Sequence, residues 1–123
     1  MARRELQDNG QLSFIREAAE AIYAGALVAI NSSGKVINAA DTAGLKVIGV
    51  AQETVASGSK VNVLTGIWGF AVSGITISNV CETATVVDNN TVGLAAGTTN
   101  DITVGQIVDV RDGLAFVKIA FGN

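Results

Sequence analysis

The sequence of 123 residues contains neither proline nor histidine, and its only cysteine is Cys81. The lack of histidine excludes the Ser–His and Cys–His pairs of nucleophilic enzymes. One cysteine can form neither an internal disulfide nor a thiolate metal cluster, and the flanking Val80 and Glu82 bring no cation that would activate its thiol. We therefore expect no enzymatic activity, no metal and no other cofactor.

Binding motifs for small molecules are also missing. The chain has no phosphate-binding loop and no dinucleotide fingerprint before a helix. Its acidic residues fall mostly at predicted turns, and the run Asp88-Asn89-Asn90 lacks the alternating acids of a calcium loop. The sequence therefore predicts no small-molecule substrate.

Long apolar runs and positive charge are scarce as well. No apolar run reaches the roughly 18 residues that a membrane span needs, and no signal peptide is evident. The formal net charge of -3 disfavours a nucleic-acid partner, which would require a basic face. We expect synthesis in the cytoplasm, with no membrane and no nucleic acid as partner.

Charged residues make up 15% of the chain, against about 25% in a typical soluble domain. They are concentrated at the start, where residues 1–20 hold Arg3, Arg4, Arg16 and four acids. The rest of the surface is either rich in Thr, Ser and Asn or partly covered by other subunits. We favour the second interpretation.

A weak internal repeat spans most of the chain. The segment 22–51 has a counterpart about fifty-six residues later, in the segment 83–110. In both segments an apolar run leads into an Asn- or Asp-containing turn, then a loop of small residues, then a second apolar run with a glycine. Two copies are too few for a solenoid. The repeat therefore predicts two related β-units.

Residues 21–123 are expected to form a single all-β domain. Val, Ile and Thr dominate, and short apolar runs are bounded by Gly, Asn, Asp and Ser. This pattern predicts a small antiparallel β-barrel or sandwich of β-tulip-like form. The expected strands are 21–24, 26–31, 35–39, 46–52, 59–64, 67–72, 75–78, 83–87, 91–94, 104–111 and 114–121.

Residues 1–20 are expected to form a separate N-terminal arm, extended or partly helical. Ser13 is a suitable helix N-cap, and the following run FIREAAEA favours a short helix. Such a helix is too short to be stable alone, so its apolar face must contact either its own domain or another protein. Phe14 and Ile15 are the notable apolar residues of this polar segment.

Trp68 and Phe70 lie at the join between the two predicted units. They alternate with small residues, which favours a place in the core of the sheet. The alternative is a subunit interface, where tryptophan is a preferred anchor.

The chain resembles the head decoration proteins, or capsid cement proteins, of tailed phages and prophages. The resemblance covers about residues 20–121. It rests on the order and spacing of the segment IYAGALVAINSSGKVINAADTAGLKVIGVAQETV, the aromatic strand TGIWGF, the segment TVVDNNTV and the closing hairpin after GQIVDV. Cys81-Glu82 departs from the pattern, because a glycine-containing turn is expected there, and the arm matches no pattern of the family.

This resemblance implies a virion protein on the outer surface of the capsid. It would bind the major capsid protein, bridge its subunits and so stabilise the head. It would also associate with itself, as a homotrimer in preference to a dimer. The contacts expected with the capsid are Arg3, Arg4, Phe14, Ile15, Arg16 and Tyr23.

Two other functions remain open. One is a different phage structural role, as a β-module associated with the tail tube or with a fibre. The other is a carbohydrate- or peptide-binding β-module of a cellular protein, for which the exposed aromatic platform would be Trp68.

Overall fold

The structure, a computed structural model, describes residues 13–119 of the chain. In this part the fold is all-β, as predicted, with two short 3₁₀ turns, η1 (Ile77–Asn79) and η2 (Ala95–Gly97). The strands are β1 (Ser13–Glu17), β2 (Leu27–Ile30), β3 (Val36–Asn38), β4 (Lys46–Ala51), β5 (Lys60–Leu64), β6 (Gly66–Val72), β7 (Thr83–Val86), β8 (Thr91–Gly93), β9 (Thr103–Arg111) and β10 (Leu114–Ile119).

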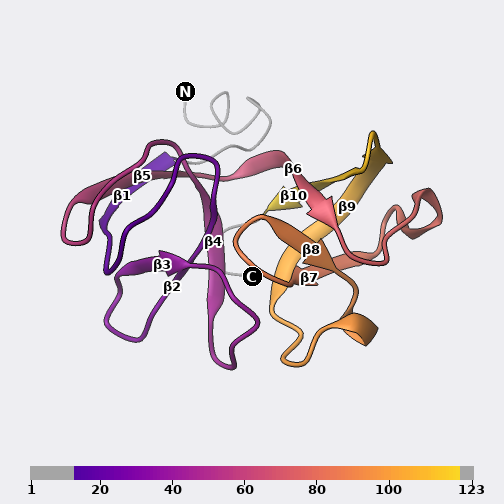
Figure 1. Ribbon diagram of the computed structural model, residues 1–123, viewed down its shortest axis with the longest axis horizontal. Coiled ribbons are helices and arrows are strands. Elements are labelled where there is room, and N and C mark those ends of the chain that lie inside the picture. The colour runs from indigo at the N-terminus through magenta and orange to yellow at the C-terminus, as the bar shows by residue number, and fades with distance from the viewer. Residues whose placement is uncertain (1–12, 120–123) are drawn as a thin grey trace, which may run out of the picture.

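The strands form two units with the same topology, which confirms the predicted pair of related β-units. The strand order is β1-β5-β4-β2-β3 in the first unit, and the second unit repeats it as β6-β10-β9-β7-β8. Figure 1 shows the two units side by side, with the chain passing from one to the other between β5 and β6. Only Thr65 separates these two strands.

Each unit is closed at an equivalent place. In the second unit β6 pairs in parallel with β8, through Ala71↔Thr91 and Val72↔Val92, and completes a closed barrel. In the first unit a single parallel bridge joins Ala18, just after β1, to β3. The first sheet therefore approaches the same closed shape with fewer hydrogen bonds.

The first unit is bent by a β-bulge beside a glycine. Val28 of β2 pairs with Gly49 of β4, and the register shifts between Val28 and Ala29. A Cβ atom on Gly49 would lie 2.3 Å from the carbonyl oxygen of Leu64. The backbones of β4 and β5 are thus closer than any side chain at this position permits, which is a typical reason for glycine in a strongly curved sheet.

The second unit has the same feature at the matching position. Ala84 of β7 pairs with Gly105 of β9, and the register shifts between Ala84 and Thr85. A Cβ atom on Gly105 would lie 2.0 Å from the carbonyl oxygen of Lys118. The repeat therefore preserves the bulge, the glycine and the close backbone approach together.

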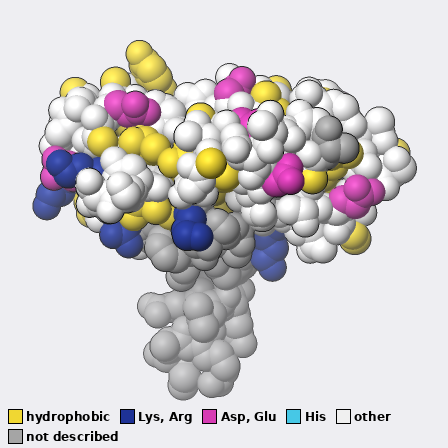
Figure 2. All heavy atoms as spheres, turned by 90° about the horizontal axis from the view of Figure 1, so that it is seen from below, with side chains coloured by type: hydrophobic (Ala, Val, Ile, Leu, Met, Phe, Trp, Pro, Cys, Tyr) yellow, Lys and Arg dark blue, Asp and Glu magenta, His cyan; other side chains and the backbone are white. Residues whose placement is uncertain are grey.

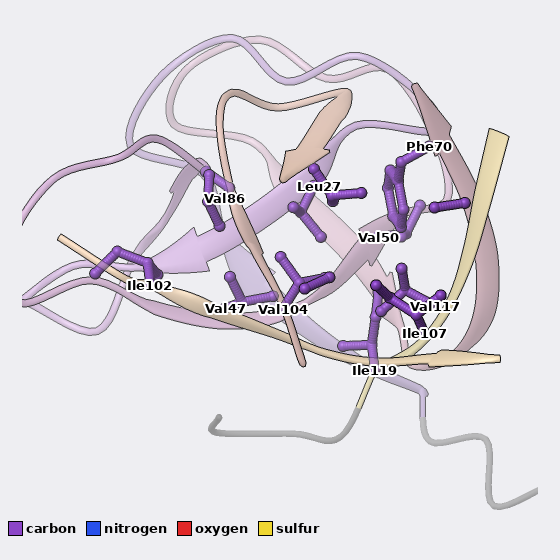
Figure 3. Close-up of a cluster of buried hydrophobic side chains, with 14 of the residues drawn as sticks. Leu27, Val47, Val50, Phe70, Val86, Ile102, Val104, Ile107, Val117 and Ile119 are labelled. Carbon is purple, nitrogen blue, oxygen red and sulfur yellow. The ribbon is translucent and has the colours of Figure 1, made fainter. Parts of the chain in front are cut away.

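Two clusters of apolar side chains form the core, and β2 and β4 contribute to both. Val28 and Ile48 point into the first unit, whereas Leu27 and Val50 on the opposite faces of these strands pack against the second unit. Figure 3 shows Leu27 and Val50 in one cluster with Phe70 of β6. Burial on both faces explains why β2 and β4 are nearly continuous apolar runs.

The predicted helix after Ser13 is wrong, because residues 13–17 form β1. This strand pairs antiparallel with β5 from Ser13↔Leu64 to Glu17↔Lys60, and Ala18 after it is fully buried. Pairing with β5 satisfies the backbone and outweighs the helix propensity of the Glu- and Ala-rich run, which is too short for a stable helix. Residues 13–17 of the predicted arm thus belong to the first sheet, and Ala18 makes a bridge to β3. Residues 1–12 lie outside the described residues.

Two predicted strands are also absent from the described residues. In the segment 21–24 only Ile22 makes a bridge, to Val55, and residues 77–79 of the segment 75–78 form η1 instead. Both segments connect strands of a small barrel, where apolar residues fill gaps without joining the sheet. Ile22 is fully buried and Ile75 nearly so, whereas Ile77 is exposed.

The two glycines at which neighbouring backbones lie close together, Gly49 and Gly105, lead to a prediction about stability. We expect Gly49→Ala and Gly105→Ala each to lower the free energy of unfolding by about 1–3 kcal/mol, because the added methyl group forces the paired strands apart. Urea unfolding followed by tryptophan fluorescence measures this change. Gly97→Ala is the matched control, since a Cβ there meets no atom within 4 Å. Wild-type stability in both variants would contradict the assigned role.

Candidate interaction surfaces

Nothing in the described residues 13–119 suggests a catalytic centre. No group of three or more His, Cys, Asp or Glu side chains gathers there as a metal site would require, and Cys81 is exposed. No helix in this part of the chain is long and apolar enough to cross a membrane. The exposed surfaces of the described residues are therefore the candidate sites for binding a partner.

The predicted capsid contacts fall on different parts of the molecule. Ile15 lies on β1 and Tyr23 in the connection to β2, and each is 65% exposed. Arg16 is half-buried on β1. Arg3, Arg4 and the side chain of Phe14 lie outside the described residues. Ile15 and Tyr23 are therefore the two candidates whose side chains the structure shows to be largely accessible.

Ile15 lies on a face that is otherwise polar. It pairs with Asn62 of β5, and the Asn62 side chain accepts a hydrogen bond from Ser13 Oγ (3.0 Å) and donates one to Gln52 Oε1. The Asn62 backbone N–H donates to Glu53 Oε1 (2.7 Å). The polar groups around Ile15 thus bond one another and leave its side chain uncovered.

The equivalent face of the second unit has different side chains. Gly69 stands at the position of Ile15, and it pairs with Phe116 of β10. The Phe116 ring covers this glycine, since a Cβ there would lie 3.1 Å from the ring edge. The Arg111 guanidinium lies 5.0 Å from the centre of the same ring. The Phe116 ring therefore covers Gly69, whereas Ile67, two residues earlier on β6, is 52% exposed.

The two aromatic residues at the join face inward. Phe70 is only 3% exposed and belongs to the large core cluster. Trp68 packs against that cluster, and its Nε1–H donates to the carbonyl of Thr65 (2.9 Å). Phe70 thus fills the core, the first of the two alternatives for this pair. An interface role for the exposed part of Trp68 stays a prediction.

A polar clamp joins the loops of the two units. The Asp41 carboxylate, in the β3–β4 loop, accepts hydrogen bonds from the backbone N–H groups of Thr99 (2.7 Å) and Asn100 (2.8 Å). The Asn100 side chain donates to the Asp41 carbonyl at 2.8 Å. The two backbone donors hold the pKa of Asp41 below its ordinary value, because they stabilise the charged carboxylate.

A hollow of about 250 Å³ lies where the two units meet, and six residues line it: Tyr23, Ala24, Gly25, Ala26, Asn89 and Asn90. The sequence alone predicts Asn89 and Asn90 only as residues of a turn. Their proximity to Tyr23 depends on the contact between the units, because the Asn89 carbonyl accepts a hydrogen bond from Leu27 N–H (2.8 Å). No local pattern could have shown this arrangement.

The rest of the visible surface is weakly charged. Figure 2 shows a face on which uncharged atoms predominate and the Lys, Arg, Asp and Glu side chains are dispersed. Such a face lacks the single-sign field that steers nucleic acid or other charged partners. Recognition here must depend on shape, apolar contacts and hydrogen bonds.

Comparison with known proteins gives a likeness in fold. No family model matches the chain, and no curated protein matches it. Among solved structures, the chain is similar to the N base of the head fiber gp8.5 of bacteriophage phi29, with a TM-score of 0.56. The match has 23% sequence identity and covers 89% of this chain and 94% of that chain. It shows that the two chains share a fold over nearly their whole lengths.

The Asp41 clamp gives a pH prediction. Because the folded-state pKa is lowered, the carboxylate stabilises the fold above its ordinary pKa of 3.8, and this contribution is lost as the pH falls through the lowered value. We expect Asp41→Asn to melt at a lower temperature than wild type at neutral pH. At about pH 2 we expect the two proteins to melt at the same temperature.

Thermal denaturation across this pH range tests the Asp41 prediction. Asp88→Asn is the matched control, since the Asp88 carboxylate accepts only a local bond from Asn90 N–H (2.9 Å). Its melting temperature should stay close to that of wild type at each pH. Equal melting temperatures for Asp41→Asn and wild type at neutral pH would contradict the clamp.

Proposed function

We propose that this chain is a structural protein of a tailed-phage particle that binds the outer surface of the head and bridges major capsid protein subunits. The observation that supports this function is the fold shared with the base of a phage head fiber over 89% of the chain. In this proposal the protein acts by binding alone. Such binding requires accessible apolar side chains and free backbone edges on a rigid body, and no reactive groups.

Ile15 is the proposed apolar anchor. Its side chain is 65% exposed, although the residues around it are polar and bonded to one another. Full burial of an isoleucine side chain against a partner contributes about 1.5–3 kcal/mol. One such contact is weak, but many copies on one head, or several linked within an oligomer, give durable attachment.

The edge of β1 is the proposed backbone contact. Over Ser13–Glu17 this strand has one strand neighbour in the described part of the chain, β5. An extended segment of a capsid subunit can add to the other edge by main-chain hydrogen bonds. Phe14 and Arg16 belong to the same strand, and Arg3 and Arg4 complete the proposed contact.

Self-association is part of the same proposal. A homotrimer, or else a dimer, would present several β1 edges to the capsid at once. Linking the contacts in this way raises the effective concentration of each second site. Each oligomer would then bridge neighbouring capsid subunits and resist their separation.

A second candidate is a fibre-associated module of the virion. The same likeness favours it, because the similar chain is the base of a head fiber. The two candidates differ in copy number per particle. A cement protein occupies sites across the whole capsid lattice, whereas a fibre base occupies a limited set.

Co-sedimentation with heads that lack this protein tests the proposal, with bound copies counted against the major capsid protein. We expect saturable binding, and a loss of about tenfold or more in affinity for Ile15→Ser, because the apolar contact is removed. Ile77→Ser is the matched control, since Ile77 is an isoleucine on η1 with 61% exposure. A truncation of residues 2–12 should weaken binding while β1 and the buried Ala18 stay in place.

Three results decide between the candidates. Saturation near one copy per capsid subunit supports the cement function, and saturation at a limited set of sites supports the fibre-associated function. Absence of binding to heads contradicts both. Equal binding by Ile15→Ser and wild type contradicts the assignment of β1 as the contact.

A further inference from the structure

The hollow between the two units is lined by uncharged residues. They are the small-residue run Ala24-Gly25-Ala26 together with Tyr23, Asn89 and Asn90. None of these six residues carries a charge. Sites of this kind, concave and placed where two units meet, combine apolar surface with a few fixed polar groups.

Tyr23 is the aromatic component of this site. It is 65% exposed, and its hydroxyl has no hydrogen-bond partner in the described part of the chain. The neighbouring backbone is well fixed, because Ala24 N–H donates to Thr54 Oγ1 (3.0 Å) and Gly25 N–H to the Ala51 carbonyl (2.9 Å). The structure thus holds an amphipathic ring in solvent on a rigid support.

Asn89 is held rigidly on the opposite side. Its carbonyl accepts a bond from Leu27 N–H (2.8 Å), and its Nδ2 donates to Asn38 Oδ1 (2.9 Å). Asn38 is fixed in turn by Glu20, whose Oε2 accepts bonds from the Asn38 backbone and side chain (2.8 Å each). Among the described residues no donor reaches Asn89 Oδ1, so this oxygen remains a positioned acceptor.

Asn90 supplies the complementary donor. Its backbone N–H donates to Asp88 Oδ1 (2.9 Å), its carbonyl accepts from Ala71 N–H (3.0 Å), and its Oδ1 accepts from Thr91 Oγ1 (3.0 Å). Within residues 13–119 its Nδ2 has no acceptor. Two neighbouring lining residues thus offer an acceptor and a donor that the described residues leave unbonded, and the bonds that hold Asn89 and Asn90 lower the entropic cost of binding.

We propose that this hollow binds a neutral pyranose unit of a polysaccharide. The apolar C–H face of the sugar ring packs on Tyr23, and adjacent hydroxyls, each both donor and acceptor, match Asn89 Oδ1 and Asn90 Nδ2. The absence of charged lining residues favours a neutral sugar over an anionic one. The site replaces Trp68, which packs inward, as the aromatic platform, and it is independent of the proposed binding to the head.

Saturation-transfer NMR and calorimetry on the full chain test the proposal. The probes are four neutral trisaccharides: maltotriose, cellotriose, chitotriose and mannotriose. We expect at least one to bind wild type at millimolar concentration, and Tyr23→Ala and Asn90→Ala each to weaken this binding at least tenfold. Ile77→Ala, which removes another exposed apolar side chain, should bind as wild type does. Circular dichroism confirms that each variant is folded.

Two outcomes overturn the saccharide site: that no trisaccharide binds, or that binding is unchanged in Tyr23→Ala. If no saccharide binds and Tyr23→Ala lowers co-sedimentation with heads, the hollow is assigned to the capsid contact instead. Because saccharide binding is measured without heads, its failure leaves the proposed structural function unaffected.

Discussion

The close approach of backbones at two glycines is the constraint on which the fold depends. A Cβ at Gly49 or Gly105 would lie 2.3 or 2.0 Å from the carbonyl oxygen of the neighbouring strand. The bulge beside each glycine bends its sheet, and the bend brings the first strand of each unit back toward β3 or β8. Five short strands can then enclose a core of their own. Without this curvature the sheets would be flat, with long open edges.

The two units also share apolar surface. Because β2 and β4 are buried on both faces, their outward residues Leu27 and Val50 enter the core cluster of the second unit. The Asp41 clamp and the hydrogen bond from Asn89 Nδ2 to Asn38 fix loops of the two units at either side of this contact. The hollow lined by Tyr23 and Asn90 owes its shape to this shared core, and so does the arrangement of its polar groups.

The sequence predicts the parts of this structure that depend on local patterns. Short apolar runs bounded by polar residues and glycine locate β4, β5, β9 and β10 closely, and the Asp112-Gly113 turn, with both residues at positive φ, joins the last two strands as expected. The β1 strand is missed because its identity depends on pairing with β5, whereas the Ala- and Glu-rich residues that follow it favour a helix. The hollow is missed for a similar reason, since Tyr23 and Asn89 are distant in sequence and only the contact between the units brings them together.

The repeat also bears on the contact proposed at Ile15. Two units with one topology have equivalent outer faces, and differences between these faces are not required by the fold itself. At one position the second unit has Gly69 under the Phe116 ring, with Arg111 over that ring, whereas the first unit has an uncovered Ile15. Exposure of a large apolar side chain lowers solubility and adds nothing to the stability of the isolated chain. The proposed burial of Ile15 by a partner would account for the absence, in the first unit, of the aromatic cover that Phe116 gives to Gly69.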